Sequence, residues 1–521
     1  MKKKRKRGQP VFKEYNQEQM LLLPPSLDEL VPQNHVVRLV NKALDGMNID
    51  PMLFWYKGGG TSSYHPRMML KVLIYAYTQR IYSSRNIAKA LRENIHFMWL
   101  SGGNRPDFRT INRFRAEQLR STIEQVFSLV VTLLIEHGHV KMENYFLDGT
   151  KIEANANKYS FVWKKSAKAY KARLQKQITE LLDHIDEVND EENRDYGNRD
   201  LEELGEENPI SSEELEAKIE ELNRRLKEDA NAPEKGKEIS ELEESYLPRL
   251  KKYETQETLC CSRNSYSKTD TDATFMRMKE DHMRNGQLKP GYNVQIGTEN
   301  QFIIGYSIHQ KPTDTTTLIP HLEKMVENLG RFPKNVITDA GYGSEENYEY
   351  VENRGIGNYI KYNYFHFEQK RNFKKNPYRV ENLPYDSKKD EFTCPAGKAI
   401  QYAGESVRKT DTGFVQHLRV YECESCKWCR QRKECHRSKY NRKIEINENL
   451  KNLKDRVRKN LMSPQGRLLR SMRPIEAESV FGHIKHNRML KRFLLRGIEK
   501  VNIEWGLASI AHNFLKMSLA V

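Results

Sequence analysis

Hydrophobic residues recur at helical spacing through residues 26–140, which predicts that this part of the chain is helical. Apolar positions lie three and four residues apart in two runs, Met68–Ile74 and Ile123–Leu129. Two shorter helices are expected between these runs, at Ser83–Leu91 and Asp107–Arg115, and a Ser-Gly-Gly turn separates them.

The second of the two short helices is rich in arginine and carries Arg109, Arg113 and Arg115. A basic helix that follows another helix and a glycine turn favours a helix-turn-helix-like DNA-binding unit, with these arginines on the DNA. The alternative is an ordinary helical bundle that presents an arginine-rich face to solvent.

Short strands are expected around two acidic residues, Asp148 and Asp339. The run Asn144–Thr150 is apolar and aromatic until Asp148-Gly149, and Asn335–Asp339 is a second short run that ends in an acid. Other elements complete an α/β pattern: a hairpin at Gly291–Gly297 and Phe302–Ile308, a helix at Thr315–Leu329, a helix from about Ser344 and a strand at Tyr359–Tyr362.

Residues 164–257 form a charged segment with apolar residues at helical spacing. Ser211 and Glu214 fit a capping box at the start of one helix, and Pro233 is expected to break that helix. This pattern predicts a helical hairpin or coiled-coil-like insertion, with loops near 190–210 and 230–236. A solvated spacer or a dimer contact suits such a segment better than a catalytic role.

The charge of the chain points to a polyanion as its partner. The net charge is +16 and the sequence pI is about 9.2. Nucleic acid is the usual partner of such a basic protein, and a ribosome or a membrane surface is the alternative. Residues 1–20 are expected to be a flexible basic arm without the apolar core of a signal peptide. The longest apolar stretch, Val126–Ile135, is too short to cross a bilayer, so we expect a cytoplasmic protein without a membrane partner.

Asp148 and Asp339 are candidates for metal ligands because both end predicted strands of one α/β pattern. Carboxylates at the rim of a sheet can converge on Mg²⁺, which prefers oxygen ligands, and a pair of such ions promotes phosphodiester chemistry. An aspartate after a strand is, alternatively, an ordinary turn residue. Glu153 competes with Asp148 for the first position.

Glu478 is the best candidate for a third acid, with Glu476 as its competitor. Pro474 suits the start of a helix, and seven residues, about two turns, place Glu478 and Lys485 on one helix face. The expected polar stripe of this helix is Glu478, Lys485, Arg488 and Arg492, in a basic region that fits a phosphate-binding surface. The alternative is a surface ion pair between the glutamate and the lysine.

Three segments resemble signature blocks of bacterial insertion-sequence DDE transposases. They are Leu147–Asn155, Thr338–Ser344 and Glu478–Lys485, and Arg492–Gly497 resembles the stretch that follows the glutamate in that family. The glutamate-to-lysine spacing matches the family's Tyr-Arg-Glu-Lys signature. Arg473 departs from it, because it lies five residues before Glu478 where the signature has an arginine four before, and Pro474 holds that place.

The resemblance implies an RNase H-like mixed sheet core with Asp148 on its first strand, Asp339 on its fourth and Glu478 on a late helix. It further implies two Mg²⁺ or Mn²⁺ ions, and cleavage and strand transfer at the terminal inverted repeats of a mobile element. Double-stranded DNA at those repeats and at the target would be the partner of a homodimer acting on the bacterial nucleoid. Lys485, Arg488, Arg492, Arg473, Arg109, Arg113 and Arg115 are the expected DNA-binding residues. Asp270 and Asp272 lie in a stretch that also recurs in the family, and they are expected on the substrate side or behind the metal ligands.

The domain organisation that follows from these patterns has six parts. A helical DNA-binding domain (1–140) precedes the first part of the core (141–163), the charged helical insertion (164–257), the continued core (258–364), a loop-rich, Cys-rich insertion (365–448) and a C-terminal helical part with Glu478 (449–521).

Five of the seven cysteines fall in the segment 365–448. Two overlapping C-x₂-C pairs in a reducing compartment indicate a small structural zinc site. The expected ligands are Cys394, Cys426, Cys429 and Cys435, and Cys423 or His436 can replace one of them. The alternative is a set of free or redox-reactive thiols.

Two other functions are compatible with the same acids and basic surface. A non-transposing nuclease on this core would not need terminal inverted repeats, and an inactive DNA-binding relic would tolerate Asp339→Ala. A metabolic enzyme is disfavoured because the chain has no glycine-rich phosphate loop or dinucleotide motif.

Overall fold

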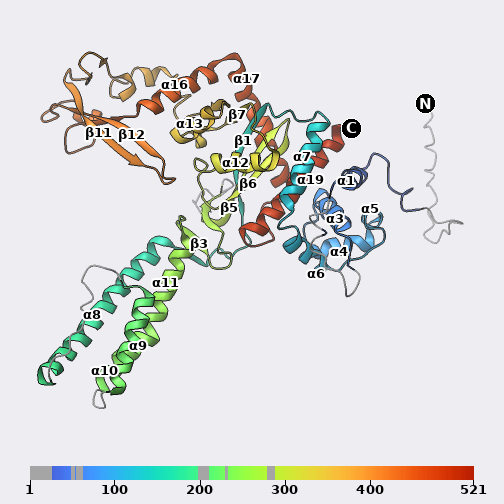
Figure 1. Cartoon of the computed structure of the whole chain (residues 1–521). Helices are drawn as coiled ribbons and strands as arrows, with labels where there is room; N and C mark the ends of the chain where they lie inside the picture. Colours follow the sequence, from blue (N-terminus) through green and yellow to red (C-terminus); the bar gives the residue numbers. More distant parts are fainter. Residues whose placement is uncertain are drawn as a thin grey trace, which may run out of the picture.

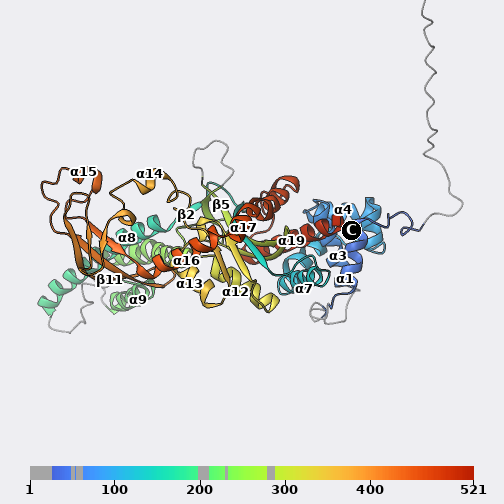
Figure 2. The same cartoon turned by 90° about the horizontal axis from the view of Figure 1, so that it is seen from above.

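The computed structural model describes residues 26–48, 53, 63–196, 210–228, 233–278 and 288–520. A central body carries two projections, a helical arm and a small sheet (Figure 1). Seen from above, the small sheet and the N-terminal helices lie at opposite ends of an elongated molecule (Figure 2). The basic arm expected for residues 1–20 lies outside the described residues.

The body is built on a six-stranded mixed sheet with the order β4-β5-β1-β7-β8, in which β6 also pairs with β5. β1 is antiparallel to β5 and parallel to β7, and β7 is parallel to β8. The bounds are β1 Asn144–Glu153, β4 Thr274–Arg277, β5 Leu288–Glu299, β6 Phe302–His309, β7 Asn335–Thr338 and β8 Gly357–Ile360. The mixed α/β fold and the hairpin predicted from the sequence are confirmed.

Helices connect the later strands and pack against the sheet. α12 packs on β6, and α13 packs on β8. Gly330 ends α12 in the left-handed conformation, and the Ser344 side chain caps α13 by accepting a hydrogen bond from Asn347 N–H. The bounds are α12 Leu318–Leu329, η3 Ala340–Tyr342 and α13 Glu345–Asn353.

The N-terminal helices share one hydrophobic core with the sheet. The C-terminal helix α19, Ile498–Ala520, makes this connection, because it packs on β6, α7 and α3, with Trp505 fully buried. The N-terminal elements are α1 Val36–Asp45, α3 Pro66–Thr78, α4 Ser84–Glu93, α5 Ile95–Leu100, α6 Phe108–Arg113, η1 Phe114–Gln118 and α7 Ile123–Glu136. No single helix of the described ranges is long and apolar enough to span a membrane, although the bent pair Phe108–Gln118 and Ile123–Glu136 passes that test together.

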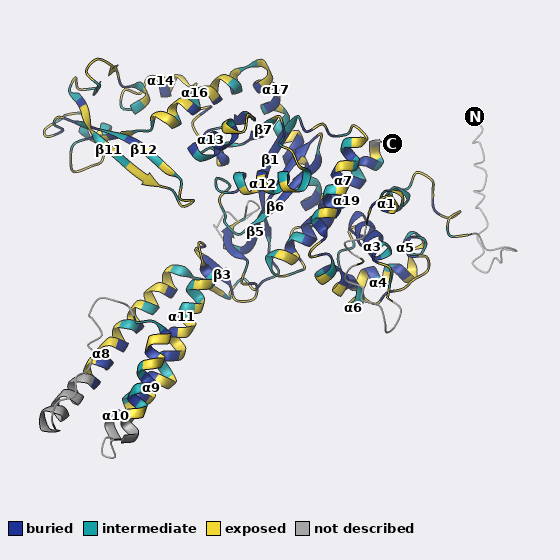
Figure 3. Cartoon of the chain, in the orientation of Figure 1, coloured by how far each residue is buried: buried dark blue, intermediate teal, exposed yellow. Residues whose placement is uncertain are grey.

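The helical arm projects from the body on the short sheet of β2 and β3 and has its own apolar core. Buried residues face the inside of the arm and exposed residues its outside (Figure 3). The predicted capping box is confirmed, since Glu214 N–H bonds Ser211 Oγ at 3.2 Å and Ser211 N–H bonds Glu214 Oε2 at 2.8 Å. The bounds are β2 Phe161–Trp163, α8 Lys164–Tyr196, α9 Ser212–Glu228, α10 Pro233–Glu241, η2 Leu242–Tyr246, α11 Leu247–Cys260 and β3 Ser265–Ser267.

The Cys-rich segment contains a five-stranded antiparallel sheet, so the prediction that it is loop-rich was wrong. Its longest strand, β11, exposes most of its residues, and an exposed polar strand lacks the hydrophobic alternation that reveals a strand. The bounds are α14 Arg371–Lys374, η4 Val380–Asn382, β9 Tyr385–Asp386, β10 Glu391–Thr393, β11 Ala399–Lys409, β12 Val415–Cys423, α15 Arg432–Cys435 and β13 Lys443–Ile446.

The segment around Glu478 is one bent helical path that alternates α and π turns. Pro474 lies inside this path, so the prediction that it starts a helix was wrong. Ser463 caps the earlier start instead, by accepting a hydrogen bond from Gly466 N–H. The bounds are α16 Glu448–Met462, α17 Pro464–Arg473, η5 Pro474–Glu478, α18 Ser479–Gly482 and η6 His483–Asn487.

Candidate active site

Asp148 lies where β1 separates from β7. The parallel pairing of the two strands ends at Phe146 and Ile337, while β1 continues beside β5 to Glu153. The expectation that the strand stops at Asp148 was therefore wrong, although the acid does sit at the split in the sheet. Its carboxylate is 5% exposed, and Oδ1 accepts a hydrogen bond from Gly149 N–H at 2.9 Å.

Asp339 follows the last residue of β7, as predicted. Its Oδ1 accepts a hydrogen bond from Gly341 N–H at 2.8 Å and caps the single turn η3. The backbone thus fixes one oxygen of this carboxylate, and the other, Oδ2, lies 3.5 Å from Arg473 Nη2. The two aspartates consequently reach the same point from adjacent strands.

The Arg473 guanidinium contacts all three candidate acids. Its Nη2 lies 3.1 Å from Asp148 Oδ1 and 3.5 Å from Asp339 Oδ2, and its Nη1 lies 3.0 Å from Glu478 Oε1. The three acids are far apart in the sequence, and the fold gathers them around a single cationic group.

A π turn explains how Arg473 and Glu478 meet at a spacing of five residues. In an α-helix, residues five apart differ by about 140° around the axis, because each residue turns the helix by about 100°. Here Ser479 N–H bonds Pro474 C=O, the i→i+5 bond of a π turn, which brings residues five apart above one another. Pro474 promotes this widening because it has no N–H for the regular α-helical bond.

No metal-ligating arrangement exists in the structure: among the described residues, no three histidine, cysteine, aspartate or glutamate side chains are placed to hold an ion. At the three acids, the guanidinium of Arg473 lies at the point where their oxygens converge. The donor set nevertheless fits a divalent cation, since three carboxylates already share one cationic partner.

Asp314 is a fourth carboxylate beside this site, and sequence analysis missed it. Its Oδ1 accepts hydrogen bonds from Asn293 Nδ2 at 2.8 Å and Gln295 Nε2 at 2.9 Å. A Cβ at Gly149 would lie 2.7 Å from Asp314 Oδ1, so only glycine allows the carboxylate to approach β1 beside Asp148. A lone aspartate in the loop before a helix carries no sequence signal that separates it from a capping residue.

The other candidate acids have structural roles. Glu476 is 4% exposed, and its Oε2 accepts a hydrogen bond from Gln301 N–H at 2.7 Å, which ties the helical path to the β5–β6 turn. Glu153 pairs with Lys289. Asp270 accepts hydrogen bonds from Tyr292 and Gly497, and Asp272 accepts one from Ile498 at the start of α19. Their place on the substrate side or behind the metal ligands stays a prediction.

The predicted polar stripe beyond Glu478 does not exist as one exposed face. Lys485 and Arg488 are 7% and 9% exposed, while the apolar Met489 is exposed, because the second π turn, η6, rotates the later residues. Arg488 donates to the carbonyls of Tyr77 and Thr78, and Arg492 donates to those of Ala154 and Ala156.

The arginines predicted near α6 divide into two groups. Arg115 is buried and donates to Tyr82 C=O and Ser84 Oγ, so it supports the fold rather than an open surface. Arg109 and Arg113 are exposed on α6, and both Arg85 and Arg109 stack on the Phe108 ring. A short helix, α5, separates α4 from α6, so the unit is not the simple pair of helices that the sequence indicated.

The cysteines of the small sheet surround a cavity of about 20 Å³, close to the smallest volume that holds one water molecule. N–H groups donate to three of the sulfurs: Lys398 N to Cys394 Sγ at 3.3 Å, Arg442 N to Cys426 Sγ at 3.3 Å and Arg442 Nη1 to Cys435 Sγ at 3.2 Å. Both ring nitrogens of His436, which lines the same cavity, are buried without a hydrogen-bond partner. All five thiols are free, and burial raises the pKa of Cys423 to about 12.

Two sequence profiles of transposases match parts of the chain. A sequence profile described as "Transposase DDE domain" matches residues 393–518, which include Arg473 and Glu478. A second profile, "Transposase domain (DUF772)", matches residues 25–117, which include the exposed arginines of α6. The two matches support an insertion-sequence DDE transposase.

Asp148 and Asp339 lie outside both matched ranges, so their place beside Glu478 is evidence from the structure alone. Membership of the family implies an enzyme that cleaves nucleic acid, binds DNA and uses divalent metal. No curated protein and no solved structure shows significant similarity to the chain.

Proposed function

We propose that the chain cleaves the ends of its mobile element and joins them to target DNA, with Asp148, Asp339 and Glu478 as the metal-binding acids. The contact of all three carboxylates with one guanidinium carries this proposal. Because Asp339 follows a strand parallel to β1, both aspartates leave the same region of the sheet. Bound Mg²⁺ or Mn²⁺ would supply an activated oxygen nucleophile and neutralise charge on the leaving oxygen.

The core that positions these acids is, in this proposal, RNase H-like. The support is the order of the strands: when the short strand β4 is left aside, Asp148 lies on the first strand in chain order and Asp339 follows the fourth. Backbone N–H groups of Gly149 and Gly341 hold one oxygen of each aspartate. The chain thus keeps its ligands oriented before any substrate arrives, which lowers the cost of assembling the site.

The proposed DNA surface combines the active site with the exposed face of α4 and α6. Arg109 and Arg113 would contact phosphates or bases of the terminal repeats, together with the exposed residues Arg85, Lys89 and Arg92. Arg115, Arg488 and Arg492 are left out of this surface because their guanidinium groups bond the protein backbone or buried side chains. Joining two element ends calls for two copies of the chain, so the active form is proposed to be a homodimer on nucleoid DNA.

A structural zinc ion in the small sheet is a second part of the proposal. Cys394, Cys426, Cys429 and Cys435 remain the proposed ligands, since N–H groups already donate to three of these four sulfurs. All four thiols line one existing cavity. Zinc there would hold together a sheet whose hydrophobic core is small.

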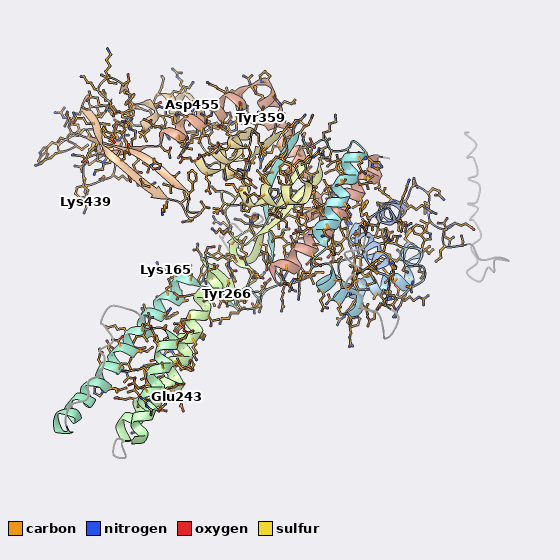
Figure 4. The ribbon with its side chains drawn as sticks, viewed as in Figure 1. Lys165, Glu243, Tyr266, Tyr359, Lys439 and Asp455 are labelled. Atoms are coloured by element: carbon orange, nitrogen blue, oxygen red, sulfur yellow. The ribbon has the colours of Figure 1, made fainter. Side chains whose placement is uncertain are left out.

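The deciding experiment is cleavage and joining of a labelled element end in the presence of Mg²⁺. We expect D148N, D339N and E478Q each to lower the rate by about 10³-fold or more, because each removes a charged ligand worth several kcal/mol of transition-state stabilisation. D455N is the matched control, since Asp455 lies on α16 on a different part of the surface (Figure 4).

Two results would contradict the proposal. Cleavage without joining, or without preference for the element end, would indicate a nuclease that does not transpose. Full activity of D339N would exclude this acid from the chemistry. A weak activity that none of the three variants alters would indicate a DNA-binding relic.

A further inference from the structure

The three proposed metal ligands share a cation that belongs to the chain. Arg473 contacts one oxygen of each acid, at 3.1 Å, 3.5 Å and 3.0 Å for Asp148, Asp339 and Glu478. A guanidinium that holds these oxygens competes with a metal ion for the three acids, because both are cations that draw carboxylate oxygens to one point.

One donor group of Arg473 has no hydrogen-bond partner. Arg473 Nε is buried and has no hydrogen-bond partner, so part of the guanidinium is desolvated without compensation. The side chain is 17% exposed, and Glu478 beside it is 52% exposed, which leaves a path toward solvent. The residue is also the last of α17, directly before the π turn, and π turns are a frequent feature of functional sites.

We propose that Arg473 is a built-in counter-ion that competes with metal for the three acids and transfers to a DNA phosphate when substrate binds. This inference rests on the proposed function of the acids. A phosphate offers the guanidinium two parallel charge-assisted hydrogen bonds, a better match than three carboxylates that each accept one. DNA binding then frees the carboxylates, and metal affinity and DNA affinity raise each other by the same factor.

The consequence is a site that stays poorly loaded with metal in the absence of DNA. Without Arg473, three carboxylates would lie close together with one positive charge fewer, and a divalent ion would be their best partner. With Arg473 in place, the three acids stay close together, but the guanidinium occupies one oxygen of each. The same residue therefore keeps the ligands together and lowers their affinity for the metal ion until DNA binds.

The test measures Mn²⁺ binding to the full-length protein by calorimetry, with metal alone as the probe. We expect R473Q to bind Mn²⁺ about tenfold more tightly than the wild type, a difference of about 1.4 kcal/mol. R473K keeps the positive charge but loses the two parallel N–H groups of the guanidinium, so we expect an intermediate affinity for Mn²⁺. R456Q is the matched control, because Arg456 pairs with Glu352 on another surface, and its Mn²⁺ affinity should equal that of the wild type.

A second measurement adds a DNA duplex to the same titration. Wild-type affinity for Mn²⁺ should rise on DNA, and that of R473Q should change little. Thermal unfolding with and without Mn²⁺ provides a readout for R473Q that does not depend on activity, and Mn²⁺ should stabilise this variant more than the wild type.

The outcomes separate this inference from the proposed function. If Mn²⁺ binding is lost in D339N but R473Q binds no more tightly than the wild type, the acids hold metal and the counter-ion role of Arg473 is wrong. If neither the wild type nor R473Q shows Mn²⁺ binding that D339N removes, both proposals are wrong. Tighter binding by R473Q that is abolished in R473Q/D339N supports both.

Discussion

At the scale of single residues, neighbouring acids of one helical path serve different purposes. Glu476 and Glu478 are two positions apart, yet Glu476 is buried against the β5–β6 turn and Glu478 is half exposed beside Arg473. Burial raises the pKa of Glu476, so this carboxyl is poorly suited to stay charged beside a metal. The local sequence could not separate the two glutamates, but their partners do: Gln301 of the β5–β6 turn for Glu476 and Arg473 for Glu478.

Asp314 gives a prediction at the same scale. We expect D314N to lower the rate of DNA cleavage about tenfold, because a negative charge beside Asp148 and Asp339 contributes to metal affinity. Asparagine can still accept the hydrogen bonds from Asn293 and Gln295, so the unfolding temperature should stay near that of the wild type. Single-turnover kinetics at several Mg²⁺ concentrations measure the effect, and D411N, on the exposed β11–β12 turn, is the control. Unchanged kinetics at limiting Mg²⁺ would remove Asp314 from the site.

At the scale of elements, the π turns place residues on other helix faces than those predicted from their spacing. The π turn η5 moves Glu478 under Arg473, and η6 then turns Lys485 and Arg488 inward. A helical wheel at 100° per residue assumes that every turn is α-helical, so it fails after the first wide turn. The same wheel correctly described the helical arm, where the predicted apolar residues form the core.

The small sheet supplies the prediction for an element. Purified protein should contain about one zinc per chain, and C426S should lose it, because a closed four-ligand site tolerates no missing thiolate. Removal of zinc by a chelator should lower the unfolding temperature of this part of the molecule. Elemental analysis and calorimetry measure the two effects, with C261S as the control, since Cys261 is exposed at the end of α11. Protein free of zinc but equally stable would leave the thiols without a metal-binding role.

At the scale of the whole molecule, one core joins the N-terminal helices to the sheet, while the helical arm has a core of its own. The link is α19, the last helix of the chain, which lies between the two parts. The proposed DNA contacts on α6 and the acids on the sheet therefore belong to one packed body. The two projections meet the body through narrower connections (Figure 1).

The net charge of +16 gives the prediction for the whole molecule. DNA affinity should fall about 10³–10⁵-fold between roughly 50 and 200 mM salt, because bound phosphates release their counterions. R113Q should reduce the salt slope by about one without loss of stability. R488Q should keep the slope but lower the free energy of unfolding by about 2 kcal/mol, since it removes hydrogen bonds to two buried carbonyls. Fluorescence anisotropy and denaturant unfolding measure these effects, and a salt slope that fell equally in both variants would contradict this division.

Much of the fold near the site was predictable, because its strands and helices carry strong local patterns. β7, the β5–β6 hairpin and α12 follow hydrophobic runs bounded by turn residues, and Asp339 lies at a strand end as expected. The small sheet was not predictable, since its exposed strands lack alternation. The roles of Arg115, Arg488 and Arg492 were not predictable either, because an arginine that bonds distant carbonyls has the same local sequence as one that faces DNA.

The sequence by itself determined the candidate acids and their order, the basic character of the chain and the cysteine cluster, because each is a property of residue type and spacing. Only the tertiary structure decided that Asp148, Asp339 and Glu478 meet at Arg473, that Asp314 lies beside them and that several arginines are internal. The physical reason is that most of these contacts join segments that are not neighbours in the sequence. Their geometry depends on where β1 separates from β7 and on one wide helical turn.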